Sequence, residues 1–310
     1  MPGPYAHITL VNELRKNILK KSAYVPTCEA MSAILDFFAF CELGSVSPDY
    51  PNLALDDDNA LVWADAMHYT RTGDMIRSGV KYIRSIDNNA RCKALAWLLG
   101  YSAHVATDVT IHPVVKIKVG DYAQNKRQHR LCEMHQDAFV FQRMNMGEIG
   151  ESRHFSAAIF GCGEQGDQER LDDVIVQLWN AMLEEVHPDL YVSHPPDVQG
   201  WHARFVSIAG SGGKTDYELF PLANVIASRI GSGYPTFGEV DRQYVENLQI
   251  PMGYGMDYDD IFDRATVNVG LIWRMVERGV CVDDLSCLSY IRAWDLDTGL
   301  DENGKYAFWN

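Results

Sequence analysis

The sequence has little positive charge and no long hydrophobic run. Its 310 residues contain 27 lysines and arginines against 42 aspartates and glutamates, which gives a formal net charge of −15 at pH 7. Nucleic acids and anionic membrane surfaces attract proteins through concentrated positive charge, so this balance argues against a nucleic-acid partner. No uninterrupted apolar stretch is long enough for a transmembrane segment, and no stretch indicates a protein partner.

The cysteines give no sign of a disulfide framework or of a thiolate metal site. They number seven, an odd count, and no two of them form a Cys-x-x-Cys pair. The first residues, Met1-Pro2-Gly3-Pro4, lack the basic and apolar regions of a secretory signal peptide. We therefore expect a cytoplasmic protein, or one exported without a cleaved signal peptide.

Two common hydrolase signatures are also missing. The chain has no His-Glu-x-x-His sequence of the zinc proteases, and no histidine is directly followed by aspartate, which excludes the His-Asp phosphohydrolases. Apolar residues instead recur with helical spacing, without internal repeats. The sequence predicts a single all-α domain over residues 1–310, with a loop-rich insertion or lid around residues 190–255 and a C-terminal helix around residues 258–278.

One predicted helix concentrates metal-ligand side chains. His104, Asp108 and His112 stand four residues apart in an otherwise apolar segment, and this spacing places them on one helical face. A helix that is apolar nearly all round is buried, and burying two imidazoles and a carboxylate is costly unless each has a partner. A metal ion suits all three. His129 and Glu133 repeat the four-residue spacing on a second helix.

The alternative is an ordinary structural role for each of these side chains. A single buried histidine or aspartate is more often hydrogen-bonded to a neighbour than bound to metal. Five of them at matching spacings on two helices favour a metal site, and three further residues extend the set. The candidate metal ligands in chain order are His7, Asp49, His68, His104, Asp108, His112, His129 and Glu133.

This order, with its Gly-Tyr-x-x-His-x-x-x-Asp-x-x-x-His-Pro and His-x-x-x-Glu motifs, resembles the zinc-dependent phospholipase C family over about residues 3–140. The family's all-α multi-helix bundle is shared with single-strand-specific zinc nucleases. The resemblance implies a Zn²⁺ cofactor. By that resemblance one zinc would be held by Asp49, His68, His104 and Asp108, a second by His112, His129 and Glu133, and Asp108 would bridge to a third, which His7 also binds.

The sequence departs from the family pattern in two places. The family completes its third zinc with an N-terminal Trp, which does not stand at the start of this sequence, so we expect two or three zinc ions. The family also holds choline with two aromatic residues. Tyr50 matches the first, whereas Asp65 occupies the second position, and Trp63 either replaces that aromatic residue or belongs to the core. Tyr50 and Asp65 are the candidate substrate-binding residues.

The ligand set determines the expected chemistry. Three or four protein ligands per metal leave room for water, and clustered zinc lowers the pKa of that water toward neutrality. A metal-bound hydroxide would then attack phosphorus, and the resemblance implies that Asp49 orients the water or accepts its proton. We therefore expect a zinc-dependent phosphoric ester hydrolase, in first place a phospholipase C-like enzyme that cleaves a phosphodiester such as a phospholipid headgroup ester. A single-strand nuclease and a non-catalytic metal-stabilised interaction protein remain the alternatives.

Overall fold

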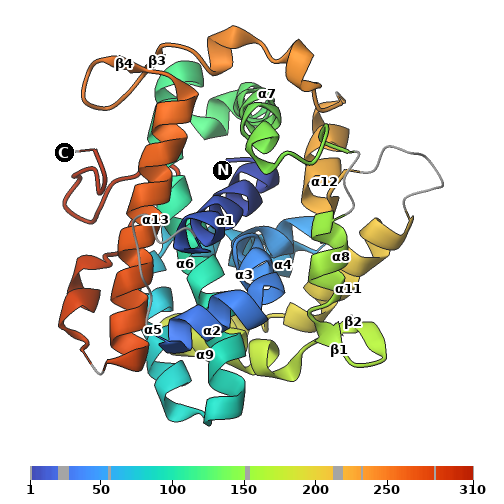
Figure 1. The fold of residues 1–310 in the computed structure, drawn as a ribbon, viewed down its shortest axis with the longest axis vertical. Helices are drawn as coiled ribbons and strands as arrows, with labels where there is room; N and C mark the ends of the chain where they lie inside the picture. Colours follow the sequence, from blue (N-terminus) through green and yellow to red (C-terminus); the bar gives the residue numbers. More distant parts are fainter. Residues whose placement is uncertain are drawn as a thin grey trace.

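The computed structural model describes residues 2–19, 28–54, 57–150, 154–211, 219–231, 233–282 and 284–309. Within these residues helices dominate, and strands occur only in two short antiparallel hairpins. The predicted all-α multi-helix bundle is therefore confirmed (Figure 1). None of the described helices is both long enough and apolar enough to cross a membrane.

The elements have the following bounds. The α-helices are α1 (Pro4–Leu19), α2 (Cys28–Asp36), α3 (Phe38–Gly44), α4 (Asp58–Tyr69), α5 (Thr72–Ser85), α6 (Asn88–Val119), α7 (Tyr122–Phe141), α8 (His154–Phe160), α9 (Asp173–Val186), α10 (Pro188–Ser193), α11 (Val198–Ser211), α12 (Pro221–Ile230) and α13 (Tyr258–Cys281). The 3-10 helices are η1 (Ser47–Leu53), η2 (Gln142–Met144), η3 (Phe237–Glu239), η4 (Arg242–Tyr244) and η5 (Ser286–Tyr290). The hairpins pair β1 (Gly163–Glu164) with β2 (Asp167–Leu171) and β3 (Leu248–Gln249) with β4 (Gly255–Met256).

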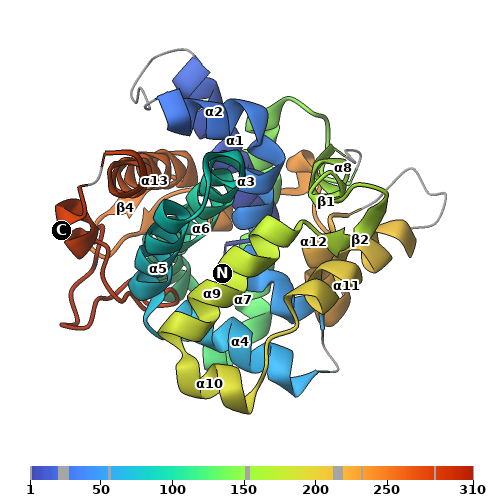
Figure 2. The same cartoon turned by 90° about the horizontal axis from the view of Figure 1, so that it is seen from below.

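Helix α6 is the central element of the bundle. Helices α1, α2, α3, α5, α7, α9 and α13 contact it, and Figure 2 shows it among α3, α5 and α13. Its residues 94–115 are buried without interruption. The helix continues through Pro113. The polar face predicted from the four-residue spacing therefore lies inside the protein, where each polar side chain requires a partner.

Helix α3 crosses α6 at very short range, and glycines make this possible. A Cβ atom on Gly100 would lie 2.0 Å from the carbonyl oxygen of Cys41, and one on Gly44 would lie 2.1 Å from a carbonyl oxygen of α6. Any side chain at these positions would force the helices apart. The close crossing brings the Ser45 carbonyl, just after α3, within reach of His104.

Helix α1 lies in the middle of the molecule (Figure 1), and a buried carboxylate fixes its first turn. The backbone N–H of Ala6 donates to Oδ1 of Asp137 at 2.7 Å, and the hydroxyl of Tyr234 donates to Oδ2 at 3.1 Å. The N-terminal N–H groups of a helix need such acceptors because they have no partner within the helix. Asp137 thus positions the turn that carries His7.

The region predicted to be loop-rich, around residues 190–255, contains a longer helix than expected. Helix α11 extends over 14 residues and buries Trp201 and Phe205. Packing of these two rings overrides the weak helical signal of a stretch rich in glycine and proline. Helix α12 packs against η1 and α7. The C-terminal helix predicted around residues 258–278 is present as α13 and forms one side of the bundle (Figure 1).

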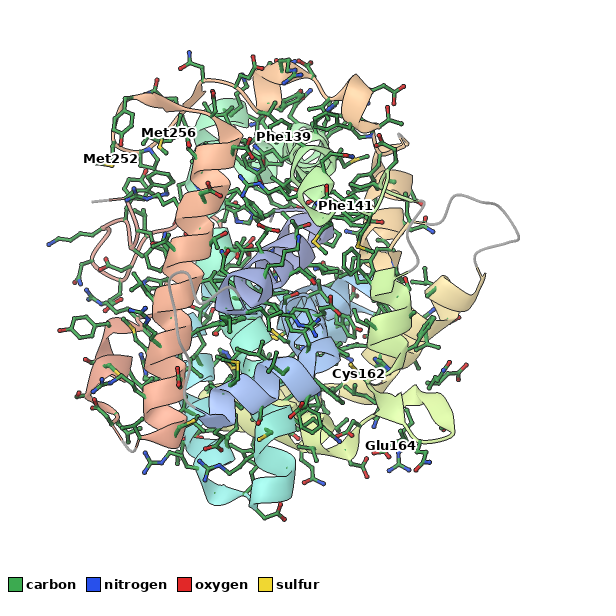
Figure 3. All side chains as sticks on the ribbon, viewed as in Figure 1. Phe139, Phe141, Cys162, Glu164, Met252 and Met256 are labelled. Carbon is green, nitrogen blue, oxygen red and sulfur yellow. The ribbon has the colours of Figure 1, made fainter. Side chains whose placement is uncertain are left out.

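The two hairpins lie at the periphery of the molecule. Figure 3 shows Met252 and Met256 at the edge beside α13, and Glu164 at a different edge of the molecule. Neither hairpin contributes a candidate metal ligand. The site is therefore built by helices and by the turns between them.

Candidate metal centre

Five metal-ligand side chains from four elements meet inside the bundle. His7 comes from α1, Asp49 from η1, His68 from α4, and His104 and Asp108 from the middle of α6. Each of the five is at most 5% exposed. Three imidazoles and two carboxylates at this depth are costly to bury unless they are paired or hold a cation.

The Asp108 carboxylate lies among three imidazoles. Its Oδ1 is 3.2 Å from Nε2 of His7, and its Oδ2 is 3.4 Å from Nε2 of His104 and 3.9 Å from Nε2 of His68. Both carboxylate oxygens are buried, yet neither makes a hydrogen bond of ordinary geometry to a described residue. The approach is close but poorly aligned for direct pairing, as expected for ligands that share a cation.

The proton positions on two of the imidazoles can be assigned from their backbone partners. Nδ1 of His68 lies 2.6 Å from the carbonyl oxygen of Ala64, and Nδ1 of His104 lies 2.9 Å from that of Ser45. Because a carbonyl oxygen only accepts, Nδ1 carries the proton in both rings. The two Nε2 atoms, 3.3 Å apart, are then both acceptors in the neutral rings. Two acceptors at this distance repel each other unless a proton or a metal cation lies between them.

The protonation states also suit metal binding. Burial lowers the pKa of His7 and of His68, and it lowers the pKa of His112 to about 3. His104 is the exception: burial opposes its charged form, but the neighbouring Asp108 carboxylate raises its pKa, so a metal ion bound there would displace a proton. Burial works against the charged form of Asp108, but His104 and His112 hold the pKa of that carboxyl well below its usual range. Neutral imidazole and ionised carboxylate are the forms that bind metal.

The donor atoms form two overlapping compact groups in the described part of the chain. The ligand atoms of His7, His104 and Asp108 lie within 4.8 Å of one another, and so do those of Asp49, His68 and His104. Nitrogen and carboxylate oxygen ligands in this number suit zinc. The unpaired Asp108 oxygens and the facing Nε2 atoms are compatible with a bound cation, and the residues fit the zinc that the sequence predicts.

The second predicted set, His112, His129 and Glu133, is only partly assembled. Nδ1 of His112 donates to the carbonyl of Leu296, and Nε2 of His129 donates to the carbonyl of Gly120, each at 2.6 Å. The other nitrogen of each ring is buried without a hydrogen-bond partner among the described residues. The three side chains do not form a further compact group there, so a second zinc at this place stays a prediction.

A C-terminal segment holds the end of α6 that carries the second set. Gly299, whose φ is +68°, packs so closely on Pro113 that a Cβ atom would lie 2.4 Å from the proline ring. The indole of Trp309 donates to the carbonyl of Thr110 at 2.8 Å. This segment also supplies the Leu296 carbonyl, so it orients His112, a candidate ligand 184 residues earlier in the sequence.

The residues predicted to contact substrate lie in different places. The ring of Tyr50 is fully buried and stacks on Phe205 with centroids 5.4 Å apart. η1 turns the ring into the core toward α11, and a substrate role for Tyr50 stays a prediction. Trp63 is a core residue as well and donates to the carbonyl of His194 at 2.7 Å. Asp65 is exposed and lines a cavity beside the metal ligands, so its substrate role stays a prediction.

Two small cavities that share Asn52 and Arg130 adjoin the ligands, and we call them together the cleft. The polar cavity, of about 60 Å³, is further lined by Asp65, His68, Tyr69, His112, Tyr122 and Asp297. The apolar cavity, of about 20 Å³, is further lined by Asp49, Leu222, Val225, Ile226 and Arg229. One end of the cleft thus carries carboxylates and phenols, and the other carries aliphatic side chains of α12.

Some residues of the cleft were not singled out from the sequence. Arg130 donates to Oε2 of Glu133 and to the hydroxyl of Tyr122, each at 3.1 Å. Burial opposes ionisation of Glu133, yet surrounding positive groups, Arg130 among them, lower the pKa of Glu133 to about 2. The position of Arg130 directly after a predicted ligand was a usable signal. No sequence signal pointed to Asp297, because only tertiary packing brings it to the cleft.

A larger cavity, of about 850 Å³, lies between α5 and η5 and contains none of the predicted ligands. Its cationic side chains are Arg77, Lys81, Arg84 and Arg292. Carboxylates pair with three of them: Asp74 with Arg77, Glu185 with Lys81, and Glu302 with Arg292. The charge there is balanced internally, so this cavity does not compete with the cleft as the candidate site.

Comparison with known families agrees with this geometry. A family model described as zinc dependent phospholipase C matches residues 6–189, more than half of the chain. The chain belongs to the zinc-dependent phospholipase C family. The matched region includes all eight predicted ligands, whereas the Leu296 carbonyl, Asp297 and α12 lie beyond it. Neither the curated proteins nor the solved structures gave a significant match.

Proposed function

We propose that this member of the family is a zinc-dependent phosphoric diester hydrolase that acts on phospholipids. The proposal depends on a cluster of hydrogen-bond acceptors in the protein interior. Nε2 of His68 and Nε2 of His104 face each other there. The carboxylates of Asp49 and Asp108 lie beside them. Such a set suits a dication, and the two cavities of the cleft adjoin it. When bound, zinc would acidify the attacking water and neutralise the phosphate oxygens.

The residues of this chain contribute positioning and proton transfer. Asp49 belongs to a compact donor group and also lines the apolar cavity, so its carboxylate can orient a water and accept its proton. The amide of Asn52 lies 3.4 Å from Oδ1 of Asp49 and restricts that carboxylate. The carbonyls of Ala64 and Ser45 hold two imidazoles in the tautomer that leaves Nε2 available.

The polarity of the cleft supports a phospholipid as substrate. In the polar cavity, Asp65 and Asp297 accompany the rings of Tyr69 and Tyr122. Carboxylates and aromatic faces together favour ammonium groups. The aliphatic side chains of α12 at the other end favour acyl-glycerol. The substrate we propose therefore directs an amine-containing headgroup toward the mouth of the polar cavity, its phosphate toward the junction, and its lipid portion along the surface of α12.

The test is hydrolysis of a substrate panel by zinc-loaded protein. Short-chain phosphatidylethanolamine and phosphatidylcholine should be cleaved faster than phosphatidylglycerol, which has no amine, and a chelator should abolish cleavage until zinc is restored. Asp297→Asn should raise KM for the amine headgroups by roughly 10-fold, because it removes one charge interaction between the cleft and the ammonium group. Equal rates on all three headgroups would contradict the headgroup assignment. Zinc-loaded protein without any phosphodiesterase activity would contradict the function itself.

A single-strand nuclease is the second candidate, and the aromatic rings of Tyr69 and Tyr122 at the cleft favour it because unpaired bases stack on such rings. The net charge of −15 opposes it. Single-stranded DNA belongs in the same panel for this reason. Cleavage of DNA but not of lipid would favour the nuclease over the phospholipid hydrolase.

A further inference from the structure

Arg130 occupies the junction of the cleft. Arg130 lines both cavities, and its side chain is 11% exposed. The hydrogen bonds to Glu133 and Tyr122 engage two of its five N–H groups. The planar group is thus held in place from one side, and donors remain for an acceptor in the cleft.

Arg229 projects into the apolar cavity from α12. It lines that cavity together with Asp49 and Arg130. Burial, and then the positive charge of Arg130, lower the pKa of Arg229, so the two guanidinium groups are close enough to repel each other. Within the part of the chain that the structure describes, Arg229 has neither a carboxylate within ion-pair distance nor a hydrogen-bond partner. Arg229 is solvent-exposed on the last turn of α12, so water solvates part of the side chain while the cavity-facing part is available to an anion.

The charge count around the cleft calls for an anion. The candidate ligands Asp49, Asp108 and Glu133 and the cleft residues Asp65 and Asp297 carry five negative charges, while two zinc ions would carry four positive charges. Arg130 at the junction and Arg229 in the apolar cavity add two more, which leaves an excess of one positive charge, and both arginines line the apolar cavity, which neither Asp65 nor Asp297 lines. Placing guanidinium groups beside a dication cluster is unfavourable unless an anion lies between them, and phosphate oxygens match the fork of an arginine.

We propose that Arg130 and Arg229 form a clamp for the phosphate group of the substrate. Arg130 binds non-bridging oxygens at the junction, where charge accumulates during phosphoryl transfer, and Arg229 holds the same group from the side of α12. This inference rests on the proposed function and adds a phosphate-recognition element that the chain itself supplies beside the metal. Arg130 therefore contributes to turnover, whereas the more exposed Arg229 contributes mainly to binding.

Inorganic phosphate provides a test that does not depend on turnover. Binding of phosphate to the zinc-loaded protein should weaken roughly 10- to 100-fold in Arg130→Gln, as expected for loss of a charge-assisted contact, and less in Arg229→Gln. Arg130→Lys should recover part of this loss because it keeps the charge without the fork. Arg127→Gln is the matched control, since Arg127 is exposed on the same helix and does not line the cleft; it should bind phosphate like wild type.

Activity supplies the second readout. Arg130→Gln should lower kcat by roughly 100- to 1,000-fold at unchanged zinc content, with partial rescue by added guanidine, and Arg229→Gln should raise KM with little change in kcat. Unchanged phosphate affinity in both variants at full zinc content would overturn the clamp. Loss of zinc in Arg130→Gln together with wild-type phosphate binding in Arg229→Gln would also overturn it, because Arg130 would then only support Glu133.

Wild-type protein that binds zinc but cleaves no phosphodiester would refute the proposed function and not the clamp. The phosphate-binding comparison among wild type, Arg130→Gln and Arg229→Gln still decides the clamp in that case. The two failures are therefore distinguishable.

Discussion

Replacing Asp108 by asparagine is the most direct perturbation of the metal centre. The substitution preserves the shape of the side chain but removes a charge that lies within 4 Å of three imidazoles. Asp108 is a member of one compact donor group and adjoins the other through His68. The carboxamide is a much poorer zinc ligand, so Asp108→Asn should weaken zinc binding at the whole cluster.

The expected size can be worked out from ligand linkage. Zinc at a free concentration of one thousand times its Kd stabilises the folded wild type by about 4.1 kcal/mol. For a chain of this size that corresponds to a rise in Tm of roughly 6 °C. Changes to residues that only support ligands reduce metal affinity by about 10- to 100-fold, so loss of a direct ligand should cost at least about 2.7 kcal/mol. The zinc-dependent rise in Asp108→Asn should therefore be about 2 °C or less.

The assay compares Tm with and without zinc in chelator-treated protein, so that any change in the metal-free stability cancels. Metal analysis gives the stoichiometry in parallel. Asp65→Asn is a suitable control because Asp65 is an exposed acid of the cleft that belongs to neither donor group. If Asp108→Asn kept the full zinc-dependent rise while Asp65→Asn lost it, the placement of the metal centre would be refuted.

The remaining predictions concern the scaffold. Gly100→Ala should destabilise the protein by roughly 3 kcal/mol or more, the upper end for overpacked cores, and reduce its zinc content, because the new Cβ atom would meet the Cys41 carbonyl oxygen. Asp137→Ala should lower stability by about 1–2 kcal/mol in a denaturant titration through loss of the cap on α1. His202, whose pKa burial lowers to about 4, should contribute a loss of about 1.4 kcal/mol per pH unit as pH falls from about 6.5 toward 4.

Each of these has a control or a contrary outcome. Gly270 lies in a helix where an added Cβ atom would make only an ordinary contact at 3.8 Å, so Gly270→Ala should be tolerated while Gly100→Ala is not.

The sign of the pH dependence for His202 follows from the unfolded chain, which binds the proton at higher pH than the folded chain does. Stability present above pH 6.5 is therefore lost on acidification, and His202→Gln should flatten the slope. An unchanged slope would mean that other groups determine it.

The spacing of residues along the chain was sufficient to predict the helix at the centre of the fold and most of the candidate metal ligands. His104, Asp108 and His112 could be placed on one buried face because an α-helix fixes the angle between successive side chains. His7 and His68 could be included only through the family's residue order. Their convergence is a property of helix packing that no local pattern contains.

The parts that could not be predicted depend on tertiary contacts. The backbone of η1, with Pro48 and Pro51, decides that Asp49 faces the metal ligands while Tyr50 turns into the core. The same holds for Asp297 and Arg229, which reach the cleft from segments beyond the matched family region. A side chain's direction within an irregular turn is set by its neighbours in space, and these were not visible in the sequence.

The Leu296 carbonyl has a consequence for synthesis of the protein. A nascent chain that has just emerged past Glu133 already carries every predicted ligand, but the acceptor that orients His112 is still to be translated. Orientation of His112 therefore waits until the last described segment has emerged and docked on α6. A chain cut before that segment would keep every predicted ligand but would lack the acceptor that orients His112.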